Sequence, residues 1–525
     1  MTTTHRHLPR PRAERSPARM RALLAPALLA LALPGAVGAQ PNPGFLMLGH
    51  LQTLAVDDAN DPLSAGHMTL NGVPVRLPRN LYVTMPGQYL TVSDLFRGKH
   101  PGTAPALAPP QAASGLALAD ANRAPVAIEA EVMGNMVGGE YVAGVVRLSQ
   151  QGLNVGQGFI RAIDTAKGEL LVGPDAGGPP VARVRINDAS GAYGKRNADK
   201  SGGEAFDERF AADPGNAAVV AITGFPMCIP ASGSDPACPA ANRSPEGGAF
   251  APSQGRRYTC GPVAAEPQAP AHAGCDPTKP TPLKVGDFIS YVGMITEDSP
   301  GSGTFFHAAH AIEALLGIYT SPGRNPAYVF TEVTIVGTLG DPWPGIDQEE
   351  TSRFRIVGFT TDPSRRVKVY AVDNPGTPAQ PSPLPADPDA GPGERLLAAL
   401  QPSPTAQIGR VRITLDAKSN FLPITRDILT RIEGHPRDAT TAAGLAQGRY
   451  TSPVSEYIAP ENTRFGRPRA PVAAPFENFC FLSRGGEALS TLGRSGPPIG
   501  RLDPFPDSGR GLVSQARADG LAACP

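Results

Sequence analysis

Aromatic side chains are scarce in this sequence, and tryptophan occurs only once. Phenylalanine, tyrosine and tryptophan together make up 6% of the 525 residues. Carbohydrate-binding surfaces commonly stack sugar rings on exposed aromatic side chains, because these offer broad apolar faces. The single tryptophan, Trp343, lies in a turn-like segment, DPWPG at 341–345. There it suits an exposed ligand contact and a core plug equally well.

Signature motifs of several large enzyme classes are also missing. The chain has no G-x-S-x-G nucleophile elbow, no H-E-x-x-H zinc motif and no G-x-x-x-x-G-K-[ST] phosphate loop. Gly156-Gln157-Gly158 lacks the third glycine of a dinucleotide-binding fingerprint and predicts a turn between strands. Nine histidines, two of them within the first 39 residues, limit the choice of general bases and metal ligands.

Charge of one sign does not accumulate anywhere in the chain. The 47 basic residues balance the 47 acidic ones, and without the first 39 residues the chain carries a net charge of −5. Nucleic-acid binding needs a basic patch, and anionic membranes attract basic clusters. No apolar run after residue 39 reaches the roughly 20 residues that span a bilayer. We therefore expect no nucleic-acid partner and no membrane insertion after loss of the N-terminal segment.

That N-terminal segment has the three parts of a secretory signal peptide. Arg21 supplies positive charge, residues 22–33 form an apolar run, and Val37-Gly38-Ala39 supplies small residues for cleavage. The run is too short to cross a bilayer. We predict cleavage after Ala39, a precursor that starts at Met20, and a secreted or periplasmic mature protein.

All six cysteines follow this segment, and none shows the C-x-x-C spacing of many zinc sites. An even number of cysteines in an exported chain indicates disulfide bonds. Near neighbours are the expected partners, because closing a short loop costs less chain entropy. The predicted bridges are Cys228–Cys238, Cys260–Cys275 and Cys480–Cys524.

Glycine and proline are abundant, with 59 residues of each. Both destabilise helix interiors, and short alternating apolar runs recur, so we expect an all-β protein with few short helices, at 393–400 and 426–434. Asn71-Gly72 between two such runs predicts a hairpin, because both residues tolerate positive φ. At 181–186, Arg183 and Arg185 alternate with apolar residues, which places the two arginines on one face of a strand.

Short strands at intervals of about 8–12 residues are typical of small barrels or sandwiches. We predict two or three antiparallel, OB-like barrels or sandwiches joined by Pro/Gly-rich linkers. The expected divisions are the signal peptide at 1–39, an N-terminal β-hairpin domain at 40–100, a first barrel or sandwich with the cysteine-containing loop at 125–280, a second at 281–420, and an irregular region at 421–525.

Two groups of residues are candidates for chemistry. On a helix, His307 and His310 would share a face and chelate a divalent metal. Phe305-Phe306 favours a strand instead, where residues three apart point to opposite faces, so we expect no cofactor, with a divalent metal as the alternative. Carboxylates near strand ends suit hydrolysis, but each also suits a turn or a solvated face: Glu332, Glu350, Asp362 and Asp373.

Five phrases of the sequence form a set. They are 60–78 (NDPLSAGHMTLNGVPVRLP), 141–164, 223–230 (TGFPMCIP), 317–329 and 358–365 (GFTTDPSR). Together they resemble large secreted proteins of unknown function from filamentous fungi and some bacteria, over most of residues 45–480. The first phrase also resembles short β-repeat domains of unknown function in secreted bacterial proteins. The resemblance implies a secreted, all-β, disulfide-containing protein and carries over no functional residue.

The missing enzyme motifs favour a secreted, non-catalytic β-scaffold with a binding or envelope/matrix role. A cell-surface or polysaccharide ligand fits that role. The alternative is an extracytoplasmic hydrolase or metal-dependent enzyme that acts on a polymer or carbohydrate. A pocket where several acids or histidines converge would favour the enzyme, and a surface without such a cluster would favour the binding protein.

Overall fold

A computed structural model divides the chain into two units, 1–40 and 41–525, and all described residues belong to the second. The predicted signal peptide, Trp343, Glu350, Asp373 and the pair Cys480–Cys524 lie outside the described residues. The described ranges are 44–61, 64–78, 81–85, 89–96, 111–121, 127–137, 139–148, 155–175, 177–187, 208–210, 216–244, 250–251, 255–299, 301–337, 353–372, 387–391, 394–404, 407–416, 427–442, 444–453, 456–458, 463–464 and 467–468.

These ranges are all-β, as predicted, and contain no helix of seven or more residues. Within them, no helix is long and apolar enough to cross a membrane. The two predicted helices are wrong: β23 (Glu394–Leu400) and β25 (Asp427–Ile432) are strands that both pair with β22 (Val367–Val372). Pairing with a neighbouring strand outweighs the weak helix preference of the leucines and alanines in ERLLAAL.

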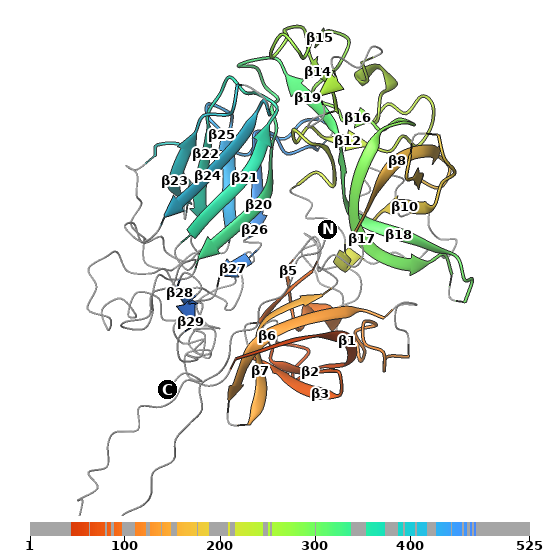
Figure 1. The fold of residues 1–525 in the computed structure, drawn as a ribbon, viewed down its shortest axis with the longest axis vertical. Coiled ribbons are helices and arrows are strands. Elements are labelled where there is room, and N and C mark those ends of the chain that lie inside the picture. Colours follow the sequence, from red (N-terminus) through yellow and green to blue (C-terminus); the bar gives the residue numbers. More distant parts are fainter. Residues whose placement is uncertain are drawn as a thin grey trace, which may run out of the picture. The chain divides into compact units, whose positions relative to one another are not determined.

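A first barrel of five strands comes from residues 44–148 (Figure 1, orange). The strand order is β3-β2-β1-β6-β7, and β3 lies parallel to β7, which closes the barrel. Asn71 (φ 51°) and Gly72 (φ 77°) form the predicted turn between β2 and β3. Two short strands, β4 (Tyr82–Thr84) and β5 (Tyr89–Thr91), continue beyond β7. The barrel strands are β1 (Gly44–Val56), β2 (Gly66–Leu70), β3 (Val73–Leu77), β6 (Glu129–Val137) and β7 (Glu140–Leu148).

A second barrel repeats this connectivity (Figure 1, yellow to green). Its order is β10-β9-β8-β17-β18, and it closes through the parallel pair β10–β18. In both barrels the third strand along the chain therefore pairs in parallel with the fifth. The strands are β8 (Val155–Asp164), β9 (Glu169–Gly173), β10 (Ala182–Ile186), β17 (Phe288–Glu297) and β18 (Phe305–Ala314).

A long insertion, residues 187–287, separates β10 from β17 and carries two disulfides. Cys228–Cys238 and Cys260–Cys275 are bonded as predicted. Buried residues of the insertion and of the second barrel form one apolar cluster, so the insertion packs on the barrel core. Its described strands are β11 (Val219–Ala221), β12 (Met227–Cys228), β13 (Phe250–Ala251), β14 (Gly255–Cys260), β15 (Ala271–His272) and β16 (Thr281–Pro282), and β19 (Leu316–Thr320) pairs with β14.

A β-sandwich follows (Figure 1, teal and blue). Its two four-stranded sheets share a small buried core, in which Val329 and Val411 of one sheet contact Val367 and Ile432 of the other. The first sheet has the order β24-β21-β20-β27, and the second β23-β22-β25-β26. The strands not yet given are β20 (Val329–Gly337), β21 (Arg353–Thr360), β24 (Arg410–Asp416), β26 (Arg449–Pro453) and β27 (Glu456–Ile458), and a separate pair is β28 (Thr463–Arg464) with β29 (Arg467–Pro468).

The strand pairings differ from the predicted organisation in two respects. The sheets are mixed rather than purely antiparallel, because each barrel closes through one parallel pair. The pairings also cross three predicted boundaries. β1 pairs with β6 across 100–125, β8 pairs with β17 across 280, and β22 pairs with β25 across 420. A parallel partner is reached only through a long connection, so it leaves no local turn signal in the sequence.

Candidate functional site

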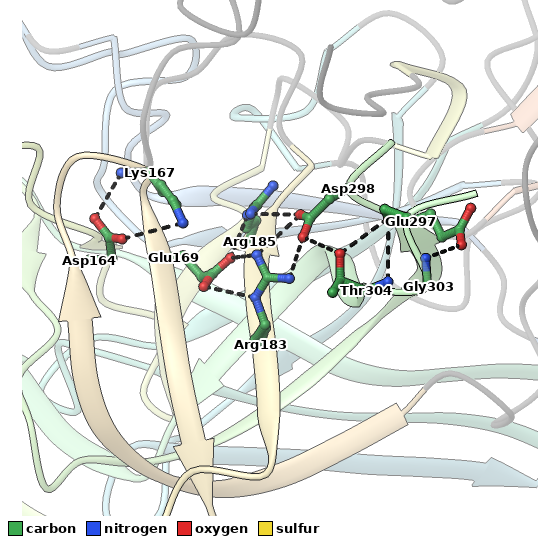
Figure 2. A network of polar contacts seen from close by, with 10 residues as sticks. Asp164, Lys167, Glu169, Arg183, Arg185, Glu297, Asp298, Gly303 and Thr304 are labelled. Carbon is green, nitrogen blue, oxygen red and sulfur yellow. Dashed lines mark hydrogen bonds and ion pairs between the residues drawn. The ribbon is translucent and has the colours of Figure 1, made fainter. Parts of the chain in front are cut away.

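A network of charged side chains joins β9, β10 and the turn between β17 and β18 of the second barrel (Figure 2). We call it the Arg183 network. Its members are Glu169, Arg183, Arg185, Asp298 and Thr304.

Strand pairing brings the first three members together. Arg185 lies directly opposite Glu169 in the antiparallel pair β9–β10, and Arg183, two residues away, shares its face. Arg183 binds Glu169 in a bidentate way, with Nη2–Oε2 2.7 Å and Nε–Oε1 3.0 Å. Arg185 Nε donates to the same Oε2 at 2.7 Å. One carboxylate thus holds both guanidinium groups.

Asp298 joins the network from the other side, at the end of β17. Its Oδ1 lies 2.9 Å from Arg185 Nη2 and 3.1 Å from Arg183 Nη2. Thr304 Oγ1 donates to its Oδ2 at 3.0 Å. The neighbouring Glu297 accepts the amide N–H groups of Gly301 (2.7 Å) and Gly303 (2.9 Å). The β17–β18 turn is therefore held together by Glu297 and joined to Asp298 through Thr304, as Figure 2 shows.

The other turn beside the network, between β8 and β9, is ordered by Asp164. Its Oδ1 accepts the amide N–H groups of Ala166 (3.0 Å) and Lys167 (3.1 Å), and Gly168 (φ 64°) completes the turn. The Lys167 side chain remains 54% exposed. The β8–β9 turn, the β17–β18 turn and the two arginines of β10 thus each contribute polar groups to this part of the barrel.

The charges of the network are fixed by mutual hydrogen bonding. The hydrogen bonds to Glu169 and then to Asp298 raise the pKa of Arg183. The hydrogen bond from Arg183 lowers the pKa of Asp298, which keeps it ionised. Arg185 is buried, with its guanidinium 4.2 Å above the ring of Phe306. Arg183 and Asp298 keep 26% and 28% of their side chains exposed, so two charged groups of the network reach the surface.

His307 and His310 lie on β18, so the strand expected there is confirmed. His310 is buried, and burial lowers its pKa to about 3. His307 is half-buried, its pKa is also lowered by burial, and its ring packs edge-on against Tyr291 at 5.0 Å. Among the described residues, no three histidine, cysteine, aspartate or glutamate side chains gather as a metal site requires. A divalent metal at this pair therefore stays a prediction.

Of the four predicted carboxylates, only Asp362 has a side chain within the described structure. Asp362 is fully buried and accepts hydrogen bonds from Arg365 Nε (2.7 Å), the Gly323 amide (2.9 Å) and the Ser364 amide (3.0 Å). Those contacts make it a turn residue. Glu332 belongs to β20, but its side chain lies outside the description.

A shallow hollow elsewhere has aromatic walls. Phe330 and Tyr450 pack edge-on in it at 5.4 Å. Asn216 Nδ2 donates to the Thr451 carbonyl at 2.8 Å, and Arg449 pairs with Asp438 at 2.8 Å. These polar groups are engaged within the protein, and the lining of the hollow combines polar with apolar surface. Its lining includes Asn216, Val220, Tyr328, Phe330, Arg449 and Tyr450.

Comparison with known protein families, with curated proteins and with solved structures yields no match. The resemblance to secreted proteins of unknown function accordingly stays a prediction. The sequence predicts one part of the Arg183 network: Arg183 and Arg185 alternate with apolar residues, which places both on one face of a strand. Asp298 gives no such signal, because its position depends on the pairing of β18 with β10.

Proposed function

We propose that this is an exported, non-catalytic binding scaffold with an envelope or matrix role, and that both of its barrels are OB-like. The identical strand connectivity of the two barrels supports the second statement. OB-type barrels bind polymers on the face of strands 2–3 and on the loops between strands 1–2 and 4–5.

The observation that carries the proposal is the position of the Arg183 network. Strands 2 and 3 of the second barrel are β9 and β10, which hold Glu169, Arg183 and Arg185. Loop 1–2 contains Lys167, and loop 4–5 contains Thr304. The polar groups therefore collect where an OB-like barrel binds its ligand. Fixed donors and acceptors suit the hydroxyl groups of a polysaccharide, and the absence of a basic excess disfavours nucleic acid.

Binding is tested with the mature protein on insoluble polysaccharides and on cell-envelope preparations, by co-sedimentation. Lys167→Ala removes an exposed amine beside the network. Thr304→Ala removes the exposed hydroxyl of the network and leaves its charged members Glu169, Arg183, Arg185 and Asp298 in place. We expect each to weaken binding by about three- to tenfold, the effect of roughly one lost hydrogen bond. Arg366→Ala is the matched control, because it removes an exposed ion pair with Glu433 in the sandwich.

Equal binding by the two site variants and the wild type would show that the ligand, if bound, sits elsewhere. Release of soluble sugars during the same incubation would instead favour the hydrolase alternative. The polymer that retains the protein identifies the chemical class of the ligand.

A further inference from the structure

Lys368 and Tyr370 lie on one face of β22 in the sandwich, opposite to Val367, which belongs to the core. The segment 387–391 crosses this face and is fastened there. Arg431, on the neighbouring strand β25, donates to the Asp389 carbonyl at 2.9 Å and lies over the Tyr370 ring at 5.0 Å. The segment thereby brings Asp387 onto Lys368.

The two side chains meet at reaction distance and out of water. Lys368 Nζ lies 3.0 Å from Asp387 Oδ1 and 2.9 Å from Oδ2. Only 11% of the lysine side chain and 3% of the aspartate side chain are exposed. Because both oxygens are nearly equidistant, the nitrogen is also within about 3–3.5 Å of the carboxyl carbon, the separation of a near-attack geometry.

Two further groups are placed to assist a reaction between them. Asp389 Oδ2 accepts from Lys368 Nζ at 2.7 Å, and its carboxylate is 55% exposed, so a proton taken from the amine can pass to solvent. The Tyr370 hydroxyl donates to Asp387 Oδ2 at 2.7 Å, and the Asp389 amide donates to Oδ1 at 3.1 Å. These donors lie where negative charge develops when an amine adds to a carboxyl group. Glu433, 4.0 Å from Nζ, is the remaining charged neighbour.

We propose that Lys368 and Asp387 condense into an intramolecular amide that staples segment 387–391 to β22. The Nζ–Cγ bond forms, one Cγ–O bond breaks, and one water molecule leaves. Asp389 accepts a proton from Nζ, and the departing oxygen leaves as water after it gains two protons. No oxidation occurs and no co-reactant is needed.

Burial favours the product over the ion pair. Two buried charges carry a desolvation penalty, whereas an amide is neutral. Amide formation is unfavourable between separate molecules in water, but a fixed pair reacts at effective concentrations of about 10⁵–10⁸ M. Burial lowers the pKa of Lys368, and the hydrogen bonds to Asp389 and Asp387 more than offset this, so the pair is ionic at rest. A proton must therefore leave Lys368 before its nitrogen attacks the carboxyl carbon of Asp387. This makes the reaction slow, but it needs to happen only once per molecule.

Peptide mapping of the mature full-length protein tests the amide directly. A protease that cleaves after lysine and arginine cuts an unlinked chain after Lys368. A linked chain yields residues 367–395 as one uncut peptide that is lighter than its sequence by one water. The exposed pair Lys167–Asp164, at 4.0 Å, is the internal control and stays unlinked in the same digest.

Two variants separate the amide from other dehydrations. Asp387→Asn condenses with loss of ammonia and gives the same linked peptide as the wild type. Lys368→Arg gives cleaved peptides of full mass. Succinimide formation at Asp389 also removes water, but it leaves Lys368 cleavable. Recovery of wild-type peptides cleaved after Lys368, at full mass and in full yield, would overturn the proposal and leave an ion pair.

Discussion

Arg183 and Asp298 are 115 residues apart in the sequence and form an ion pair across the closing edge of the second barrel, with Nη2–Oδ1 3.1 Å. Arg183 lies on β10, and Asp298 follows β17 directly. The parallel pair β10–β18 contains only three residue pairs in register. The ion pair therefore reinforces the shortest seam of this barrel.

Replacement of Asp298 by asparagine should lower the free energy of unfolding by about 1–2 kcal/mol at neutral pH, because Arg183 and Arg185 both lose a charged partner. Urea denaturation measures the change. Asp438→Asn is the matched control, since its pair with Arg449 is 69% exposed on the aspartate side; we expect less than about 0.5 kcal/mol there. Equal effects at both positions would contradict the role of the seam.

The same aspartate makes stability depend on acid pH. Its pKa is lower in the folded protein than in the unfolded chain, chiefly through the hydrogen bond from Arg183. The stabilisation is complete well above the unfolded value of about 3.9 and is lost as the pH falls through the folded value. The stability difference between wild type and Asp298→Asn should therefore shrink below about pH 4. A constant difference down to pH 2 would contradict this coupling.

His310 predicts a second acid effect at higher pH. The folded protein holds its imidazole neutral, with a pKa of about 3, whereas the unfolded chain takes up a proton near pH 6.5. Stability should fall by roughly 3–5 kcal/mol between pH 6.5 and 3, because the unfolded state binds the additional proton. His310→Leu removes the titrating group, so its denaturation midpoint should depend less on pH in this interval. An unchanged slope in the variant would place the proton uptake elsewhere.

The two disulfides should contribute comparable stability. Cys228–Cys238 and Cys260–Cys275 close loops of 10 and 15 residues, each worth about 3 kcal/mol by loop-closure entropy. Replacing either pair by two alanines should lower the denaturation midpoint, slightly more for the longer loop. Thiol labelling of the unfolded variants checks that the other bridge stays closed. Midpoints equal to that of the wild type would show that local packing alone fixes these segments.

Fragments distinguish the observed strand pairing from the predicted divisions. A fragment of residues 41–148 contains every strand of the first barrel, so we expect it to unfold cooperatively on its own. A fragment of residues 125–280 separates β6 and β7 from β1, and β8 from β17, so we expect no cooperative transition. Thermal unfolding followed by circular dichroism measures both. The opposite outcome would support the predicted divisions.

Local signals in the sequence predicted the local parts of the fold. Asn71-Gly72 predicted the hairpin correctly, because the signal, a tolerance for positive φ, lies in the two turn residues themselves. The two confirmed disulfides likewise join near neighbours. The strand at 181–186 and its arginine face were also readable, since alternation depends on a few consecutive residues.

Distant pairings were the parts that the sequence did not reveal. The closure of both barrels depends on parallel partners, and the segment 394–400 becomes a strand only because β22 lies beside it. Asp298 resembles an ordinary turn residue, and its role appears only when β10 lies next to β18. The same is true of Lys368 and Asp387, which the strand and its covering segment bring together.

The parallel pair β10–β18 also sets an order of events in time. β10 ends at Ile186 and β18 begins at Phe305. During folding, the barrel therefore stays open until the chain of the insertion and of β17 has passed and β18 can pair with β10. Pairing over such a distance is slow, because much chain entropy is lost before any contact forms. The two disulfides join cysteines only 10 and 15 residues apart. In an oxidising compartment, the two disulfides of the insertion can thus form before β10 pairs with β18.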